Sequence, residues 1–322
     1  MDILKYIWSV QKEFNKNFVD FENLDNQQGQ SMTKEYVLHT ISELNELLNE
    51  VNWKVHHKKN SVEINRRELV LEWIDVFKYW LSIGLLWDIT PEEFVKAFDE
   101  KSGLVEQRYL QEFADLNDKQ IVVCDIDGVL GDYPETFLNY VKNQELENKS
   151  TCPNFDLKNV TSYNLYEYLD GIVDTYTLKE YKKSYRESGE IRSEKVNQGA
   201  VEFLKKLKSE GYYVVLLTSR PFSQYKNLYL DTYVWLKNNG LEFDMLLNDS
   251  KKRDKIIKLT ETSTVKFIID DDPKIIEGLL NLEGVNKLYL VDKPYNSSSH
   301  FNSKKVSRVS SFEEILEKEG IK

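Results

Sequence analysis

The sequence predicts a multidomain protein in which an all-α helical bundle precedes an α/β domain with a parallel sheet and a helical cap. With 322 residues, the chain is long for a single hydrophobic core. Up to about residue 113, apolar residues recur at spacings of three and four, which is typical of helices. Beyond the polar stretch 114–120, short apolar runs alternate with helical segments, as in a parallel α/β sheet. We therefore expect domains at 1–115 and 119–322.

Composition and charge limit the function. Hydrophobic residues make up 41% of the chain and aromatic residues 12%, which is a globular composition. A net charge of -11 argues against a general nucleic-acid binder, because neutralising phosphates requires a basic face. The first residues do not resemble a signal peptide, and no apolar run approaches the length of a membrane span. We expect a cytoplasmic protein, either bacterial or in a virus-infected host cell, with no membrane partner.

Cysteines and histidines predict no zinc site. The two cysteines form no C-x-x-C pair, and the four histidines are scattered. They stand at Cys124, Cys152, His39, His56, His57 and His300. For the adjacent histidines, which precede two lysines, a solvated face is the stronger interpretation.

The segment SELNELLNE at 42–50 places carboxylates on one side of a predicted helix. Glu43, Glu46 and Glu50 fall within about a 60° sector, and apolar residues lie about a quarter turn away. This pattern alone favours an amphipathic helix with a solvated acidic face. The alternative is that the carboxylates hold a ligand.

The segment 68–87 changes this balance. It is apolar nearly all round, which predicts a helix buried on most sides, yet Glu72 and Asp75 share one stripe of it with Glu68. Buried carboxylates are costly unless they are paired or bind a metal, and the nearby cation, Lys78, lies about a third of a turn away. Two acidic pairs facing each other would offer the oxygen ligands that Mg²⁺ prefers beside phosphates. We therefore predict a metal site.

These pairs resemble a family signature. ELNE at 43–46 and EWID at 72–75 resemble the E-x-x-E and E-x-x-D motifs of the all-α NTP pyrophosphatases, and 73–85 is most similar to the dimeric dUTPase branch. The resemblance implies hydrolysis of a nucleoside triphosphate to monophosphate and pyrophosphate, a homodimer formed through the helical domain, and Mg²⁺ or Mn²⁺ as cofactor. The implied metal ligands are Glu43, Glu46, Glu72 and Asp75.

The same resemblance suggests substrate contacts. The segment FDEKSGLVEQRY at 98–109 is similar to a late element of the family and makes Lys101 and Arg108 candidates for phosphate binding. It departs from the family where Val105 replaces a frequent asparagine. Polar residues of the first helix recognise the base in that branch, which suggests Gln11 and Asn15; the alternative is that both are plain exposed polar residues.

A second acidic motif begins the α/β domain. The run IVVCDIDGVLGD at 121–132 places Asp125 at the carboxyl end of a predicted strand, where ligands bind in open α/β sheets. Asp127 follows, and Gly128 allows the chain to turn. A nucleophilic carboxylate beside one that exchanges protons is what an aspartyl-phosphate mechanism requires. The alternative, an acidic turn, does not predict the later strand ends at Thr218 and Asp270.

Together these strand ends resemble the motifs of the haloacid dehalogenase superfamily. The resemblance makes Asp125 the nucleophile, Asp127 the acid/base and Thr218 a phosphate ligand, while Ser219 and Arg220 are candidate substrate contacts. Asp125, Asp127, Asp270 and Asp271 are the candidate Mg²⁺ ligands.

A basic residue should complete this second site. We expect it in KKRDK at 251–255 and favour Lys255 at the helix start, with Lys252 as the alternative. The tyrosine-rich segment 133–195 is too long for a simple loop and predicts a helical cap over the site. Its aromatic side chains either stack on a base or only pack the cap.

The segments WLKNNGLEFD at 235–244 and LYLVDKPYN at 288–296 resemble the 5'(3')-deoxyribonucleotidase group. The two resemblances together imply a bifunctional hydrolase of small deoxynucleotides that converts dUTP through dUMP to deoxyuridine. The same architecture could act on dTTP and dTMP, or on dCTP and dCMP. Other interpretations are a DNA-end phosphatase and a dUTPase-like protein that binds a regulator.

Overall fold

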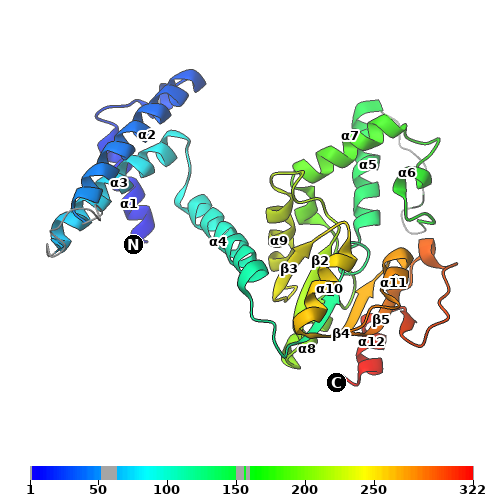
Figure 1. Cartoon of the computed structure of the whole chain (residues 1–322). Helices are drawn as coiled ribbons and strands as arrows, with labels where there is room; N and C mark the ends of the chain where they lie inside the picture. The colour runs from blue at the N-terminus through cyan, green and yellow to red at the C-terminus, as the bar shows by residue number, and fades with distance from the viewer. Residues whose placement is uncertain (1, 52–63, 150–155, 157–159, 322) are drawn as a thin grey trace. The chain divides into compact units, whose positions relative to one another are not determined.

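The structure is a computed structural model that describes residues 2–51, 64–149, 156 and 160–321. It contains two compact units, Met1–Asp99 and Glu100–Lys322, shown in Figure 1. The predicted fold class is confirmed, because the first unit is helical and the second contains a parallel sheet with a helical cap. The division falls inside helix α4, before the predicted boundary at 114–120. His56, His57 and Cys152 lie outside the described residues.

The first unit consists of helices with capped ends. Its elements are α1 (Ile3–Asn15), η1 (Phe21–Asn23), α2 (Asn26–Asn49), α3 (Arg66–Leu86) and the first part of α4 (Pro91–Phe113). Thr90 and Glu93 bond to each other's backbone N–H groups and begin α4 where the sequence predicts. Trp8, Leu81 and Leu85 form the small core.

The expectation that the helix at 68–87 is buried on most sides is wrong for this unit. Among the described residues of α3, only Leu81, Ser82 and Leu85 are buried, and Trp73 is 56% exposed. Helices α1 and α2 pack against α3, and the described elements leave most of its other side chains exposed or half-buried. The cost of burying carboxylates therefore does not by itself argue for a metal at Glu72, which is only half-buried.

The second unit is built on a six-stranded sheet. Strands run parallel in the order β3-β2-β1-β4-β5-β6. They are β1 (Gln120–Cys124), β2 (Tyr213–Thr218), β3 (Met245–Asn248), β4 (Thr264–Asp270), β5 (Val285–Val291) and β6 (Val306–Val309). The runs expected at 121–124, 214–218 and 266–270 are β1, β2 and β4.

Helices cover the two faces of this sheet, and each face has its own apolar core. The helices outside the cap are α8 (Ala200–Ser209), α9 (Leu228–Asn238), α10 (Lys252–Thr262), α11 (Pro273–Leu279), α12 (Phe312–Glu319) and the short η3 (Pro294–Asn296). Among the described residues, no helix combines the length and the apolar character that a membrane crossing requires.

A helical cap is inserted after β1. It consists of α5 (Tyr133–Lys149), α6 (Leu165–Tyr168), α7 (Thr175–Glu187) and η2 (Glu190–Ser193), with an apolar cluster that includes Phe137 and Tyr185. Figure 1 shows α5, α6 and α7 together beyond one end of the sheet. The outgoing and returning chains bond to each other, from Asp132 N to Lys195 O at 2.8 Å. This pairing fixes the base of the cap.

Side-chain amides of α4 cover the open edge of the sheet at β3. Gln107 Oε1 accepts from Leu246 N at 2.9 Å, and Gln111 Nε2 donates to Leu246 O at 2.6 Å. Unpaired backbone groups on an edge strand can pair with another chain. These glutamines form hydrogen bonds with backbone groups that a further strand would otherwise bind. They also explain why the second half of α4 belongs to the α/β unit.

Candidate functional site

The carboxyl ends of three neighbouring strands bring the predicted residues of the α/β unit together. Asp125 follows β1, Thr218 ends β2 and Asp270 ends β4, and all three are buried. Asp125, Asp270 and Asp271 each offer an oxygen, and these oxygens lie within 4.8 Å of one another. The parallel order β2-β1-β4 places these ends side by side, so this part of the site follows from the strand order.

Lys252 is the basic residue of this cluster. Its Nζ lies 2.7 Å from Asp125 Oδ2 and 2.8 Å from Asp270 Oδ2, and its side chain is 4% exposed. The preference for Lys255 is therefore corrected. Lys252 is the first residue of α10, whereas Lys255 is half-buried about 4.5 Å further along the helix axis.

The three carboxylates are suited to a divalent cation. Burial raises the pKa of Asp125 well above its usual range although Lys252 opposes the shift, and burial together with Asp270 raises the pKa of Asp271 to about 7. Asp271 Oδ2 accepts from Tyr295 OH at 2.5 Å, while its buried Oδ1 has no hydrogen-bond partner among the described residues. Three buried carboxylates against one lysine, with one oxygen unsatisfied, fit the oxygen ligands that Mg²⁺ requires.

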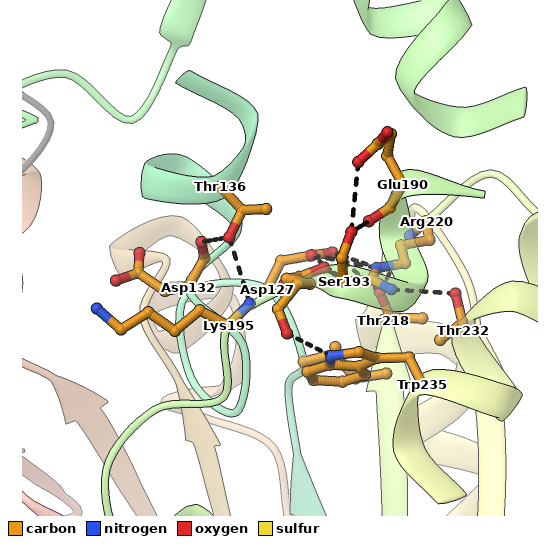
Figure 2. A network of polar contacts seen from close by, with 12 residues as sticks. Asp127, Asp132, Thr136, Glu190, Ser193, Lys195, Thr218, Arg220, Thr232 and Trp235 are labelled. Carbon is orange, nitrogen blue, oxygen red and sulfur yellow. Dashed lines mark hydrogen bonds and ion pairs between the residues drawn. The ribbon is translucent and has the colours of Figure 1, made fainter. Parts of the chain in front are cut away.

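Asp127 belongs to a different group of contacts, shown in Figure 2. Arg220 Nη2 donates to Asp127 Oδ1 at 2.7 Å and to Glu194 Oε2 at 2.5 Å, and its Nη1 donates to Thr232 Oγ1 at 3.0 Å. Thr218 Oγ1 donates to Asp127 Oδ2 at 3.4 Å. The Asp127 side chain therefore faces Arg220 and is not part of the three-carboxylate group, which corrects its expected place among the metal ligands.

Ser219 and Arg220 both line the cavity above the site, and Ser219 is exposed. The guanidinium of Arg220 is buried and paired with Asp127 and Glu194. A contact of either residue with substrate therefore stays a prediction.

Glu194 is a member of this site that the sequence does not predict. It lies directly after η2, where the chain returns from the cap, and its side chain is fully buried. Burial raises the pKa of Glu194 to about 8, against the opposing effect of Arg220. A single glutamate in SEKVN carries no motif, and its role becomes visible only when the cap segment is placed beside Arg220.

A cavity of about 350 Å³ lies between the cap and the carboxyl ends of the strands, where Asp127 and Asp271 line it. Its lining includes Asp127, Asp271 and Ser219 from the sheet side and Tyr163, Lys182 and Arg186 from the cap. Tyr163 meets Tyr295 edge to face, with ring centroids 5.6 Å apart. The sheet side of the cavity therefore carries two carboxylates and Arg220, which is paired with Asp127, and the cap side carries two cations and aromatic rings.

The helical unit has its own acidic group and its own cavity. Glu43, Glu46 and Glu72 place carboxylate oxygens within 4.8 Å of one another. Burial raises the pKa of Glu43, and the negative charges of Glu46 and Asp75 raise it further. The pKa of Glu72 is raised by the same causes in the same order. Asp75 lies outside the group of three, 3.6 Å from Lys78 Nζ, but lines the same cavity of about 490 Å³ as Glu43. The facing carboxylates repel one another, as expected of ligands that a cation would join.

Gln11 and Asn15 line this cavity and are buried, so they are not plain exposed polar residues. Gln11 Nε2 donates to Asn15 Oδ1 at 2.9 Å, and Asn15 Nδ2 donates to Ser82 Oγ at 2.9 Å. His39 and Tyr79 stack in the same cavity, with ring centroids 5.1 Å apart. Amides beside aromatic rings could receive a planar base.

Lys101 and Arg108 are exposed on the part of α4 that belongs to the α/β unit. A contact of either residue with phosphates therefore stays a prediction.

A comparison with models of protein families identifies a family for this chain. A family model described as dUTPase matches residues 3–180, whereas no curated protein matches the sequence.

Several solved structures align with about 63% of the chain. A predicted phosphatase from Clostridium acetobutylicum has a TM-score of 0.43 and 20% identity over 62% of this chain and 100% of its own. Protein Tyrosine Kinase A from Mycobacterium tuberculosis gives 0.47 and 16% over 63% and 99%. A HAD family hydrolase from Deinococcus radiodurans with bound phosphate and sodium gives 0.44 and 16% over 64% and 98%.

Proposed function

Because the chain belongs to the dUTPase family and is a nucleotide hydrolase, we propose that it carries out two consecutive hydrolyses. The helical unit hydrolyses a deoxynucleoside triphosphate, with dUTP as the preferred substrate, to the monophosphate and pyrophosphate. The α/β unit then hydrolyses the monophosphate to nucleoside and phosphate. The observation that carries this proposal is the presence of two separate acidic groups, each beside its own cavity.

In the helical unit, Glu43, Glu46, Glu72 and Asp75 would hold Mg²⁺ or Mn²⁺. Such an ion, when bound, polarises phosphoryl oxygens and lowers the pKa of a water molecule. Gln11 and Asn15 would orient the base, because an amide supplies both a donor and an acceptor to its edge. A single contact of this kind separates uracil from thymine or cytosine, so dTTP and dCTP are the competing substrates.

In the α/β unit, Asp125 is the nucleophile. A bond forms between its carboxylate oxygen and phosphorus while the bond from phosphorus to the 5' oxygen breaks, and Asp127 gives a proton to the leaving oxygen. Water then attacks the aspartyl-phosphate, gives its proton to Asp127 and releases phosphate. Lys252 and Thr218 stabilise the charge on the phosphoryl oxygens.

The buried carboxylates of this second site would also hold a divalent cation. Asp125, Asp270 and Asp271 are its proposed ligands. Mg²⁺ bound there neutralises charge on the transferred phosphoryl group. Nucleotides and Mg²⁺ are both available in the cytoplasm, which is the location we propose.

Glu72→Gln should lower pyrophosphate release from dUTP on the order of 100-fold or more, because a neutral amide is a poor ligand for a hard cation. Phosphate release from added dUMP should stay unchanged. Glu35→Gln is the matched control, since Glu35 is exposed on α2 and loses the same charge. Equal pyrophosphate release by Glu72→Gln and Glu35→Gln would contradict the proposed metal site.

We also propose that the helical unit forms a homodimer. The described part of α3 exposes several large apolar side chains, among them Trp73 at 56% and Trp80 at 45%, and such a surface is unusual for a monomer. Sedimentation equilibrium should therefore give twice the chain mass of 38.0 kDa. A single species of 38.0 kDa at micromolar concentration would contradict this proposal.

A further inference from the structure

Helix α7 of the cap brings two cations to the cavity that Asp127 and Asp271 line from the sheet side. Lys182 and Arg186 are one helical turn apart, and both line this cavity. Among the described residues, neither has a carboxylate oxygen within ion-pair distance. Instead Lys182 lies over the ring of Tyr166 at 5.2 Å, and Arg186 lies over that of Tyr225 at 5.3 Å. Both side chains are held in place, and both charges remain available to an anion.

The group of three carboxylates, of which Asp271 lines the cavity, indicates how much positive charge a phosphate would need. When all three are ionised, Asp125, Asp270 and Asp271 carry three negative charges against the one positive charge of Lys252, and a divalent cation would bring this group to neutrality. Asp127 is balanced separately by Arg220. A phosphate monoester adds two negative charges, which match the two cations of α7.

Three groups that line the cavity are in unfavourable surroundings unless an anion is bound. Like charges one turn apart on a helix destabilise it, and burial together with Arg186 lowers the pKa of Lys182 to about 8, with Asp127 opposing the shift. Tyr133 also lines the cavity, and its buried hydroxyl has no hydrogen-bond partner among the described residues. An anion with several acceptor oxygens would satisfy all three groups.

We propose that Lys182 and Arg186 form an anion subsite of the cap that binds the non-bridging oxygens of the phosphoryl group transferred to Asp125. This inference rests on the proposed phosphatase function of the α/β unit and extends it. The cap then supplies part of the charge stabilisation itself, in addition to Lys252. The alternative ligand of the same chemistry is a second phosphate on the leaving group.

The test uses the full-length protein with Mg²⁺ and compares Lys182→Met and Arg186→Met with wild type. We expect each variant to lower kcat/KM for dUMP on the order of 100-fold and to weaken inhibition by inorganic phosphate at least about tenfold. Lys183→Met, which alters an exposed lysine next to Lys182, should change neither value more than about twofold. Lys182→Arg should restore most of the activity.

The pH profile separates a charge that binds phosphate from a structural role. Lys182 faces Arg186, Asp127 and the ring of Tyr166. Since its pKa is lowered to about 8, wild-type kcat/KM should fall as the pH rises through that value and Lys182 loses its charge. In Lys182→Arg this fall should disappear, because a guanidinium keeps its proton.

Three outcomes would overturn the proposal. The first is unchanged phosphate inhibition in both methionine variants. The second is a loss seen with a deoxynucleoside 3',5'-bisphosphate but not with dUMP, which would place a leaving-group phosphate in the subsite. The third outcome applies if wild type hydrolyses no monophosphate, in which case the proposed function fails but titration calorimetry with inorganic phosphate still tests the subsite. Equal phosphate affinity of wild type and both methionine variants in that titration would then overturn the proposal.

Discussion

Asp125→Asn should lower phosphate release from dUMP by about 10⁴-fold or more, because an amide cannot form the covalent bond to phosphorus. Pyrophosphate release from dUTP should remain at the wild-type rate, since the helical unit has its own carboxylates. dUMP should therefore accumulate when the variant is supplied with dUTP. Chromatography of the products measures both rates in one reaction.

The fold of this variant should survive. Asn removes one negative charge from three crowded buried carboxylates, and Lys252 keeps its contact with Asp270 at 2.8 Å. Thermal unfolding should thus occur at or above the wild-type temperature. Phosphate release at the wild-type rate, or a simultaneous loss of pyrophosphate release, would contradict the assignment of Asp125 to a separate phosphatase site.

Lys252→Met should both inactivate the phosphatase and destabilise the α/β unit. The substitution leaves Asp125 and Asp270 buried without their cation, and breaking a buried ion pair in this way costs about 3–5 kcal/mol of the free energy of unfolding. Urea unfolding without metal should show this loss. Added Mg²⁺ should reduce it, because a bound cation would replace the missing charge.

Lys255→Met is the matched control, since it removes a half-buried lysine from the same helix without altering either ion pair. Its free energy of unfolding should stay within about 0.5 kcal/mol of wild type, and its phosphatase activity should stay within about twofold. Equal destabilisation by the two substitutions would contradict the role of Lys252. A larger loss of activity in Lys255→Met would instead favour Lys255 as the basic residue of the site.

The parts of the fold that follow from local patterns are predictable. The strand ends at Asp125, Thr218 and Asp270 can be read from apolar runs that stop at a polar residue, and parallel order then brings them together. The start of α4 is equally local, because Thr90 and Glu93 form its cap.

Features that depend on distant packing are not predictable in this way. Lys252 and Lys255 differ only in which side chain reaches back to the sheet, and Glu194 joins the site only because the cap chain returns beside Arg220. Apolar residues occur nearly all round α3 and indicate burial, yet the described part of this unit leaves Trp73 exposed. The compact units divide inside α4 because Gln107 and nearby residues bind the edge of the sheet.

The most direct measurement is the identification of products from dUTP and Mg²⁺ with the full-length protein, using chromatography for the nucleosides and phosphorus NMR for the phosphates. dTTP, dCTP and dATP serve as comparison substrates. The proposed function predicts pyrophosphate, deoxyuridine and phosphate from dUTP, with dUMP as a transient intermediate. If no triphosphate yields pyrophosphate while monophosphates are still cleaved, the helical unit is not a pyrophosphatase and the two-step function is wrong.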